Sequence, residues 1–232
     1  RAQVIDAERM APGDIIVGVS STGQARWEDR PNRGIGSNGL TSARHDGLGG
    51  DYRQRYPETY APEVDTELIY SGPCRLEDPL PGDGSMTVGE ALLSPTRTYL
   101  PLIKELVTTL PADELHGLIH CSGGGAAKIG KFGGQSDGHG NRYIKDAPLP
   151  VPPLFRYLRE VSGTSWHEAY TVWNMGCRLE AVVANEASAA ICIDLARQCG
   201  IAAQRIGYVE AAAGANHEVV VNGAGGPHHY PG

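Results

Sequence analysis

The segment "HCSGGG", residues 120–125, concentrates groups that could bind an anion. Three consecutive glycines are costly, because glycine loses more backbone freedom on folding than any other residue. A strand that runs into such a loop can turn its amides toward a phosphate, although the GxxxxGK[ST] spacing of a P-loop is absent. The alternative is a tight connection with no ligand. The candidate phosphate-binding residues here are His120, Ser122, Gly123, Gly124 and Gly125.

A second loop, "GIGSNG", spans residues 34–39 and precedes "LTSARHD", which could begin a helix. Ser37, Asn38 and Gly39 would supply hydroxyl, amide and backbone donors at the helix N-terminus, where anions bind favourably. The alternative is a helix cap after an ordinary loop. Both interpretations stay open from the local pattern.

Three isolated polar residues are further candidates. Thr96 and Arg97 lie in "SPTRTY", where a helix is expected to start. Arg97 could bind a phosphate or carboxylate through two parallel hydrogen bonds, although a lone arginine is more often structural. Asn174 lies in "WNMG" between apolar neighbours. A buried asparagine must satisfy its amide, so Asn174 is either a local clamp or a ligand contact.

Other kinds of chemistry have little support in the sequence. His228 and His229 are adjacent, and His116 and His120 lack a partner at metal-ligand spacing, so we expect no metal site. No serine or cysteine carries a signature such as GxSxG, so no catalytic residue is assigned. The five cysteines form no CxxC pair and are expected to be reduced thiols of a cytoplasmic protein.

The pattern of apolar residues predicts an α+β fold. The expected strands are residues 14–21, 115–122, 177–184, 203–211 and 217–223, and the expected helices lie within 94–110, 151–163, 165–176 and 185–200. Residues 47–90 show weak periodicity and are expected to form loops with short helices. The final strand, helix, strand, strand order is typical of half of a split βαβ sandwich.

Charge and hydropathy exclude two classes of partner. The net charge of −7 and the absence of a basic run argue against nucleic acid, which needs a concentrated basic surface. No apolar run reaches the roughly 18 residues that a membrane helix needs. We expect the chain to divide into residues 1–13, the end of a truncated amino-terminal domain or linker; 14–222, one domain; and 223–232, a loose tail.

The order of the motifs carries a resemblance to a family. The segments "PGDIIVGVSSTG", "GSNGLTSARH", "LLSPTRTYLPLIKEL", "HCSGGG", "VPPLFRYLREVSG", "YTVWNMGCRLEAVV" and "AQRIGYVE" together resemble phosphoribosylformylglycinamidine cyclo-ligase, or AIR synthase. The resemblance runs from Asp6 to about Val221. It covers the carboxy-terminal domain of that family and the last strand of the amino-terminal domain.

This resemblance implies a three-layer α/β/α-type sandwich with a mixed sheet and a partial ferredoxin-like topology. It also implies an ATP-dependent ring closure in purine biosynthesis, which converts formylglycinamidine ribonucleotide to aminoimidazole ribonucleotide. ATP and Mg²⁺ would be bound mainly by the amino-terminal domain, and the full-length protein would be a cytoplasmic homodimer. Substrate phosphate would meet Ser37, Asn38 and the glycines, while Arg97 and Asn174 would contact it or position other groups.

The chain departs from the family pattern in two loops. Gly36 stands where the family usually has a histidine, and Lys128 and Ile129 replace the usual acidic and amide pair. The loop of residues 24–35 is also longer than usual. Two alternatives therefore remain: a sister ATP-dependent phosphotransfer enzyme of the same architecture, or a non-catalytic module that binds a phosphorylated ligand.

Overall fold

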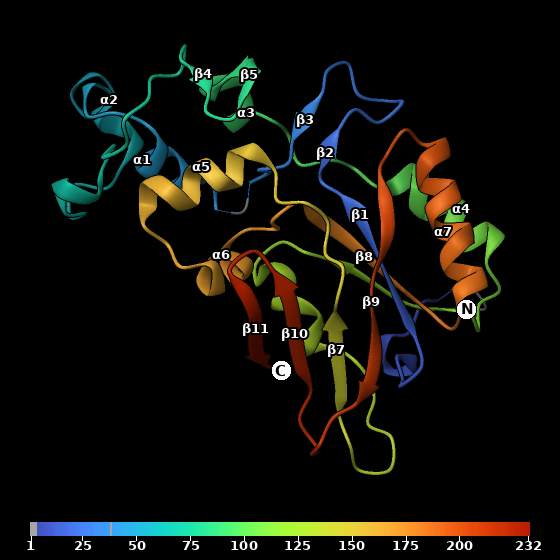
Figure 1. Cartoon of the computed structure of the whole chain (residues 1–232). Helices are drawn as coiled ribbons and strands as arrows, with labels where there is room; N and C mark the ends of the chain where they lie inside the picture. The colour runs from blue at the N-terminus through green and yellow to red at the C-terminus, as the bar shows by residue number, and fades with distance from the viewer. Residues whose placement is uncertain (1–3, 38) are drawn as a thin grey trace.

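The computed structural model describes residues 4–37 and 39–232, which form a mixed sheet with helices packed against it (Figure 1). The seven-stranded sheet has the order β11-β10-β7-β9-β1-β8-β6, in which only the β10–β7 pair is parallel. Its strands are β1 Ile15–Ser20, β6 Leu115–His120, β7 Asn141–Lys145, β8 Cys177–Val183, β9 Ala203–Ala211, β10 Glu218–Gly223 and β11 Gly226–Pro231.

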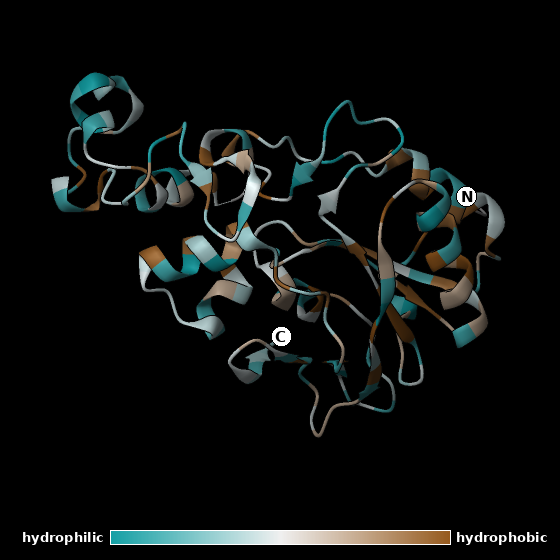
Figure 2. Ribbon diagram, turned by 45° about the horizontal axis from the view of Figure 1, so that its top comes forward, coloured by the Kyte–Doolittle hydropathy of each residue, from teal (hydrophilic) through white to brown (hydrophobic). Residues whose placement is uncertain are grey.

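Strand β1 lies between β9 and β8 and is buried along its whole length. Its side chains alternate between faces, as the two-residue period of a strand requires. Ile15, Val17 and Val19 join one apolar cluster, while Ile16 joins the cluster on the other face. Because both faces of the strand are covered, "IIVGVS" is a nearly continuous apolar run. In Figure 2, apolar residues gather in the central strands of the sheet.

Helices cover the two faces of the sheet. Helices α4 (Leu100–Thr109) and α7 (Glu186–Gln198) pack on the face of Val17, with Pro101 in the first turn of α4, where proline is tolerated. Helices α5 (Pro153–Ser162) and α6 (Trp166–Val172) and the 3₁₀ helix η4 (Gly125–Lys131) contribute to the other cluster. Ser165 caps α6 by accepting a hydrogen bond from the Glu168 amide.

The chain between β1 and α4 contains only short elements, as the weak periodicity of residues 47–90 predicted for that part. In Figure 1 much of this segment extends beyond the sheet on the side of α5. The elements are β2 Thr22–Gly23, β3 Asn32–Arg33, α1 Leu40–Gly47, α2 Asp51–Arg55, η2 Pro57–Thr59, η3 Thr66–Leu68, β4 Pro79–Leu80, β5 Asp83–Thr87 and α3 Val88–Leu92, after η1 Ala7–Arg9 near the start of the chain.

The expected loose tail of residues 223–232 is wrong. These residues include strand β11, which pairs antiparallel with β10 from Glu218–Pro231 to Gly223–Gly226. Tyr230 is buried and donates a hydrogen bond to the His167 carbonyl at 2.8 Å, and His228 is buried beside Tyr170. The glycines of "AGGPHHYPG" form a hairpin turn, and its prolines lie in an edge strand, where proline is tolerated. Because both residue types are also common in loops, the segment was predicted to be a tail.

The mixed sheet with packed helices confirms the coarse fold predicted from the sequence. The ferredoxin-like description and the domain boundary at residue 13 stay predictions, whereas β11 extends the sheet past the expected boundary at residue 222. Strand β7 was not predicted, because "NRYIK" is short and its polar residues interrupt any clear period.

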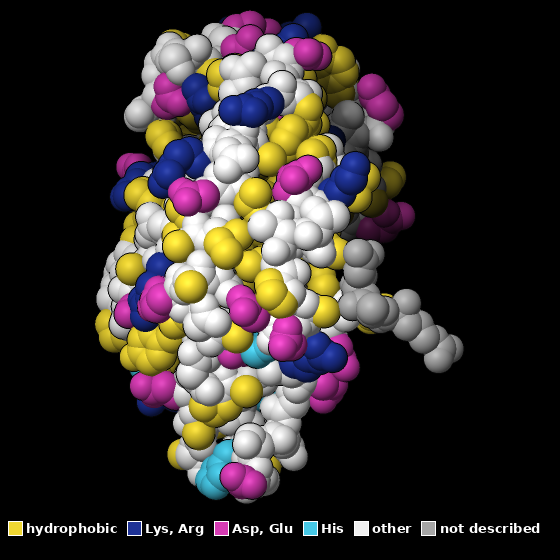
Figure 3. Space-filling model, turned by 90° about the vertical axis from the view of Figure 1, so that its right-hand side faces the viewer, with side chains coloured by type: hydrophobic (Ala, Val, Ile, Leu, Met, Phe, Trp, Pro, Cys, Tyr) yellow, Lys and Arg dark blue, Asp and Glu magenta, His cyan; other side chains and the backbone are white. Residues whose placement is uncertain are grey.

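The outer surface carries mixed charge. Figure 3 shows acidic and basic side chains interspersed over the face seen from the side of α4 and α7. No helix in the described part of the chain is long and apolar enough to cross a membrane.

An ion pair lies in the interior of the sheet. The Lys145 Nζ atom is 2.5 Å from Glu180 Oε1 and donates a second hydrogen bond to the Ala126 carbonyl, and both side chains are at most 2% exposed. Burial opposes the charged form of Lys145, but the Glu180 carboxylate outweighs it and raises the pKa of Lys145. Glu180 Oε2 finds no partner among the described residues, so the carboxylate depends on this single cation.

We predict that Lys145→Met lowers the free energy of unfolding by about 3–5 kcal/mol, because it leaves the Glu180 charge buried and uncompensated. Urea unfolding measures the change. Lys104→Met, at an exposed position of α4, should change stability by less than about 0.5 kcal/mol. The double variant Lys145→Met with Glu180→Leu should recover most of the loss, since no unpaired charge remains. Equal stability of Lys145→Met and the wild type would contradict this account of the pair.

Candidate anion-binding site

The two glycine-containing loops meet at the start of strand β8. The backbone carbonyl of Arg178 accepts a hydrogen bond from the Cys121 amide at 2.7 Å, which fixes the start of the "CSGGG" loop. The side chain of Arg178 donates through Nη2 to the carbonyls of Gly34 and Ile35, at 2.8 and 2.7 Å, in the other loop. One residue of β8 therefore holds both loops, which are far apart in the sequence.

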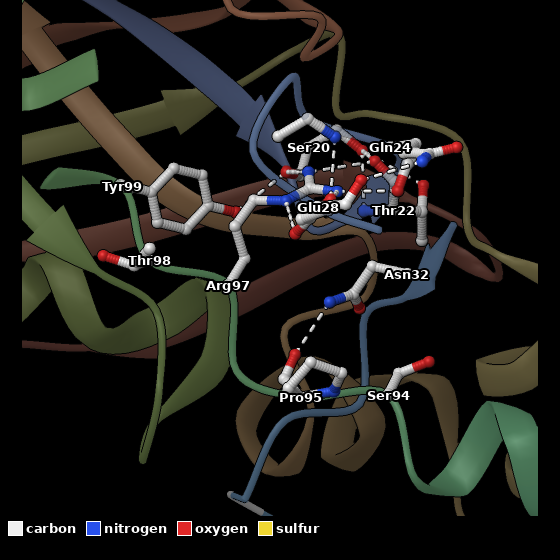
Figure 4. A network of polar contacts seen from close by, with 12 residues as sticks. Ser20, Thr22, Gln24, Glu28, Asn32, Ser94, Pro95, Arg97, Thr98 and Tyr99 are labelled. Carbon is white, nitrogen blue, oxygen red and sulfur yellow. Dashed lines mark hydrogen bonds and ion pairs between the residues drawn. The ribbon is translucent and has the colours of Figure 1, made fainter. Parts of the chain in front are cut away.

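Arg97 binds the segment that follows β1 (Figure 4). Its Nε and Nη2 atoms bind the two carboxylate oxygens of Glu28 at 2.7 and 2.8 Å. The remaining N–H groups donate to backbone carbonyls, namely those of Ser20, Thr22 and Gly23, at 3.0, 3.1 and 2.7 Å. All five N–H groups of the guanidinium are thus occupied, and its side chain is 1% exposed. Arg97 positions the loop and has no donor left for a phosphate.

The rest of the "SPTRTY" segment holds the same loop. Asn32 Nδ2 donates to the Pro95 carbonyl at 2.7 Å, and the Arg33 amide donates to Ser94 Oγ at 3.0 Å. Farther along, the amide of Ser37 donates to Thr96 Oγ1 at 3.1 Å. The segment precedes α4 in an extended form, so the expected helix start at Thr96 and Arg97 is wrong; the helix begins at Leu100.

The surroundings of Glu28 favour the ionised form of its carboxylate. Partial burial opposes the charge, but the hydrogen bonds from Arg97 and from the Ala25 amide, together with the Arg97 charge, lower the pKa of Glu28 below its usual 4.5. Its contribution to stability is therefore complete above pH 4.5 and is lost as the pH falls through the lowered pKa of the folded state.

Asn174 is a local clamp. Its Nδ2 atom donates to the Gly34 carbonyl at 2.8 Å, and its Oδ1 atom accepts from the Gly176 amide at 3.0 Å. The side chain is buried, so both ends of the amide are satisfied within the chain. Of the two interpretations that the sequence left open, the contacts favour positioning.

Two glycines allow close packing against the segment between α6 and β8. Gly39 has φ +76°, and a Cβ atom there would lie 2.7 Å from the Trp173 ring. Gly125 has φ +50°, and a Cβ atom would lie 2.2 Å from the Tyr170 carbonyl oxygen. Both positions therefore exclude larger residues for steric reasons. Gly39 also precedes α1 without a side-chain cap.

The "HCSGGG" loop is only partly available to a ligand. The Gly125 amide donates to the Ser122 carbonyl at 3.0 Å and the residue is buried, so this amide is already bonded within the loop. Gly123 is exposed and Gly124 is half-buried with φ +97°. Ser122 Oγ accepts a hydrogen bond from Lys128 Nζ at 3.0 Å. Partial removal of water from around its ring lowers the pKa of His120, and the charges of Arg178 and Lys128 lower this pKa further.

The structure thus sorts the predicted site residues. Ser37, Thr96 and Gly39 lie in one loop or against it, and His120, Ser122, Gly123 and Gly124 lie in the other. Asn38 lies outside the described residues. Arg97, Asn174 and Gly125 position the loops. Sequence reasoning missed Arg178, although an arginine within the apolar strand "CRLEAVV" was a visible signal.

A cavity of about 370 Å³ lies beside Arg97. Its lining consists of Trp27, Glu28, Asp29, Arg30, Asn32, Pro95, Thr96, Arg97 and Thr98. Across residues 4–37 and 39–232, no three histidine, cysteine, aspartate or glutamate side chains come together as a metal site. All five cysteines are free.

Comparison of the sequence with known proteins finds phosphoribosylformylglycinamidine cyclo-ligases, although no protein-family model matches. The relative from Anaeromyxobacter sp. is 30% identical over 221 residues, 95% of this chain and 53% of the relative. That from Methanothermobacter thermautotrophicus is 32% identical over 183 residues, 78% of this chain and 42% of the relative. The chain spans about half the length of such relatives or less, and the resemblance inferred from the motifs is confirmed.

Comparison with solved structures supports the fold. A hydrogenase maturation protein, HypE, in complex with ATP has a TM-score of 0.50 at 18% identity, covering 98% of this chain and 52% of that one.

We predict that Arg97→Met lowers the free energy of unfolding by about 3–5 kcal/mol, because Glu28 and three carbonyls lose their partner. The matched control is Arg30→Met, at an exposed position of the same loop, with an expected change below about 0.5 kcal/mol. Urea unfolding of the three proteins provides the comparison. An Arg97→Met protein as stable as Arg30→Met would show that the clamp does not hold the loop.

Proposed function

We propose that this chain, a relative of the phosphoribosylformylglycinamidine cyclo-ligases, is the carboxy-terminal, substrate-phosphate-binding domain of an ATP-dependent cyclo-ligase. The full-length protein would close the imidazole ring of formylglycinamidine ribonucleotide to give aminoimidazole ribonucleotide. Similarity to these enzymes over most of the chain supports the reaction class. ATP and Mg²⁺ would be bound mainly by an amino-terminal domain, and the protein would act in the cytoplasm as a homodimer.

The observation that carries the proposal is the meeting of two loops at the start of β8. Arg178 joins them through its side chain and its backbone carbonyl, and each loop presents polar groups at the surface. Backbone amides and positive charges fixed in this way are suited to a phosphate group. Ser37 and Gly39 on one side, and Ser122, Gly123 and Gly124 on the other, would hold the substrate phosphate.

In the proposed reaction, the amide oxygen of the substrate attacks the terminal phosphorus of ATP and ADP leaves. An amine of the same substrate then attacks the activated carbon, and phosphate leaves as the ring closes. Phosphorylation converts a poor leaving group into a good one. The part of this chain is to hold the substrate at its phosphate so that the reacting atoms keep a fixed orientation.

A sister ATP-dependent enzyme of the same architecture is the second candidate. The shared fold with HypE and the departures at Gly36 and Lys128 favour it, since these residues lie in the loops that would meet the ligand. A module that binds a phosphorylated ligand without chemistry is the third.

ADP release by the full-length gene product tests the proposal. With ATP, Mg²⁺ and formylglycinamidine ribonucleotide, we expect ADP release that depends on the substrate and matches the aminoimidazole ribonucleotide formed. The 232-residue chain alone should show no turnover. Folded full-length protein that releases no ADP with this substrate would discard the cyclo-ligase and leave the second and third candidates.

A further inference from the structure

Arg178 is a buried cation without a carboxylate partner. It is 2% exposed, and burial lowers the pKa of its guanidinium. The other deeply buried basic groups, Arg97 and Lys145, each bind a glutamate. No aspartate or glutamate in the described chain lies within ion-pair distance of Arg178. A buried charge is costly unless something offsets it, so this guanidinium calls for an anion.

The guanidinium of Arg178 packs against the Gly36 turn. Only Nη2 donates hydrogen bonds to described residues, those to Gly34 and Ile35, which leaves Nη1 and Nε without a described acceptor. A Cβ atom on Gly36 would lie 2.6 Å from Nη2 and 2.7 Å from Nη1. Glycine at position 36 therefore makes room for the guanidinium beside the loop that contains Ser37.

Two further basic groups belong to the loop that the Arg178 carbonyl holds, and the charges of Arg178 and Lys128 both act on the His120 ring. Lys128 Nζ donates to the neutral Ser122 hydroxyl, which leaves two of its three N–H groups for other acceptors. His120 pairs with Leu179, next to Arg178, across the β6–β8 ladder. Arg178, Lys128 and His120 form what we call the cation cluster, and none of them has an ion pair with a described carboxylate.

We propose that the cation cluster selects a ligand whose phosphoryl group is dianionic, that is, a phosphate monoester or a terminal phosphate, at the junction of the two loops. Two permanent positive charges, Arg178 and Lys128, are offset by two negative charges, whereas a monoanion leaves one uncompensated. Arg178 is bound by two loop carbonyls, and Lys128 is half-buried on the other loop. This inference rests on the proposed function, because it assigns the phosphate site of that function to particular residues.

Calorimetric titration of the chain at low ionic strength and about pH 7.5 tests the selection, since salt screens exposed charges and phosphate monoesters are dianionic there. The probes are ribose 5-phosphate, ADP and dimethyl phosphate, which is a monoanion. We expect ribose 5-phosphate or ADP to bind at least about tenfold more tightly than dimethyl phosphate. If the Lys128→Gln substitution weakens the binding of only ribose 5-phosphate or only ADP, the site takes a sugar phosphate in the first case and a nucleotide phosphate in the second.

Lys128→Gln should weaken binding of the dianion about five- to tenfold, because a hydrogen bond to a charged group is lost. Lys131→Gln is the matched control in the same 3₁₀ helix, exposed and outside the cluster, and should stay within about twofold. Arg178→Lys should weaken binding further, and a thermal melt verifies that the variant is folded. Equal affinities of Lys128→Gln and Lys131→Gln, or no preference for the dianion, would overturn the inference.

The experiments distinguish failure of the proposed cyclo-ligase activity from failure of the dianion selection. Dianion selection that depends on Lys128, in a protein whose full-length form releases no ADP, would keep this inference and discard the cyclo-ligase. Substrate-dependent ADP release with an unchanged Lys128→Gln affinity would do the reverse.

Discussion

The bidentate contact between Arg97 and Glu28, extended by three carbonyls after β1, is the constraint on which the site depends. The segment from residue 20 to residue 39 has little regular structure and few apolar side chains, so it cannot hold its own shape by packing. A fully occupied guanidinium supplies the missing order, and neighbouring residues of the "SPTRTY" segment bind the same loop as far as Ser37. The loop then reaches the start of β8, where Arg178 and Asn174 bind its carbonyls.

Much of the sheet could be predicted from the sequence, because strand and helix periods with clear caps produce local signals. Strand β1 and helices α6 and α7 followed from such patterns. Strand β11 could not be predicted in this way, because its prolines and glycines are typical of a loose tail and the strand is held by pairing with β10. The role of Arg97 could not be read either, because a lone arginine gives no sign of five acceptors supplied by a loop about 70 residues earlier.

Close packing explains why glycine is needed at positions 125 and 36. The run of three in "HCSGGG" suggested a phosphate loop, yet Gly125 is required because the Tyr170 carbonyl lies where its side chain would be. Gly36 makes room for Arg178, and Lys128 binds Ser122 at the opposite loop. These two departures from the expected family pattern lie in the two loops that Arg178 joins, although 91 residues of sequence lie between Gly36 and Lys128.

If the two loops form a single phosphate site, ribose 5-phosphate must perturb both of them in an amide NMR titration of the chain. We expect the amides of Ser37 and Gly39 to shift together with those of Gly123 and Gly124, along curves with one dissociation constant. The buried amides of Gly125 and Val17 should stay in place. Shifts confined to one loop, or two different dissociation constants, would contradict a shared site.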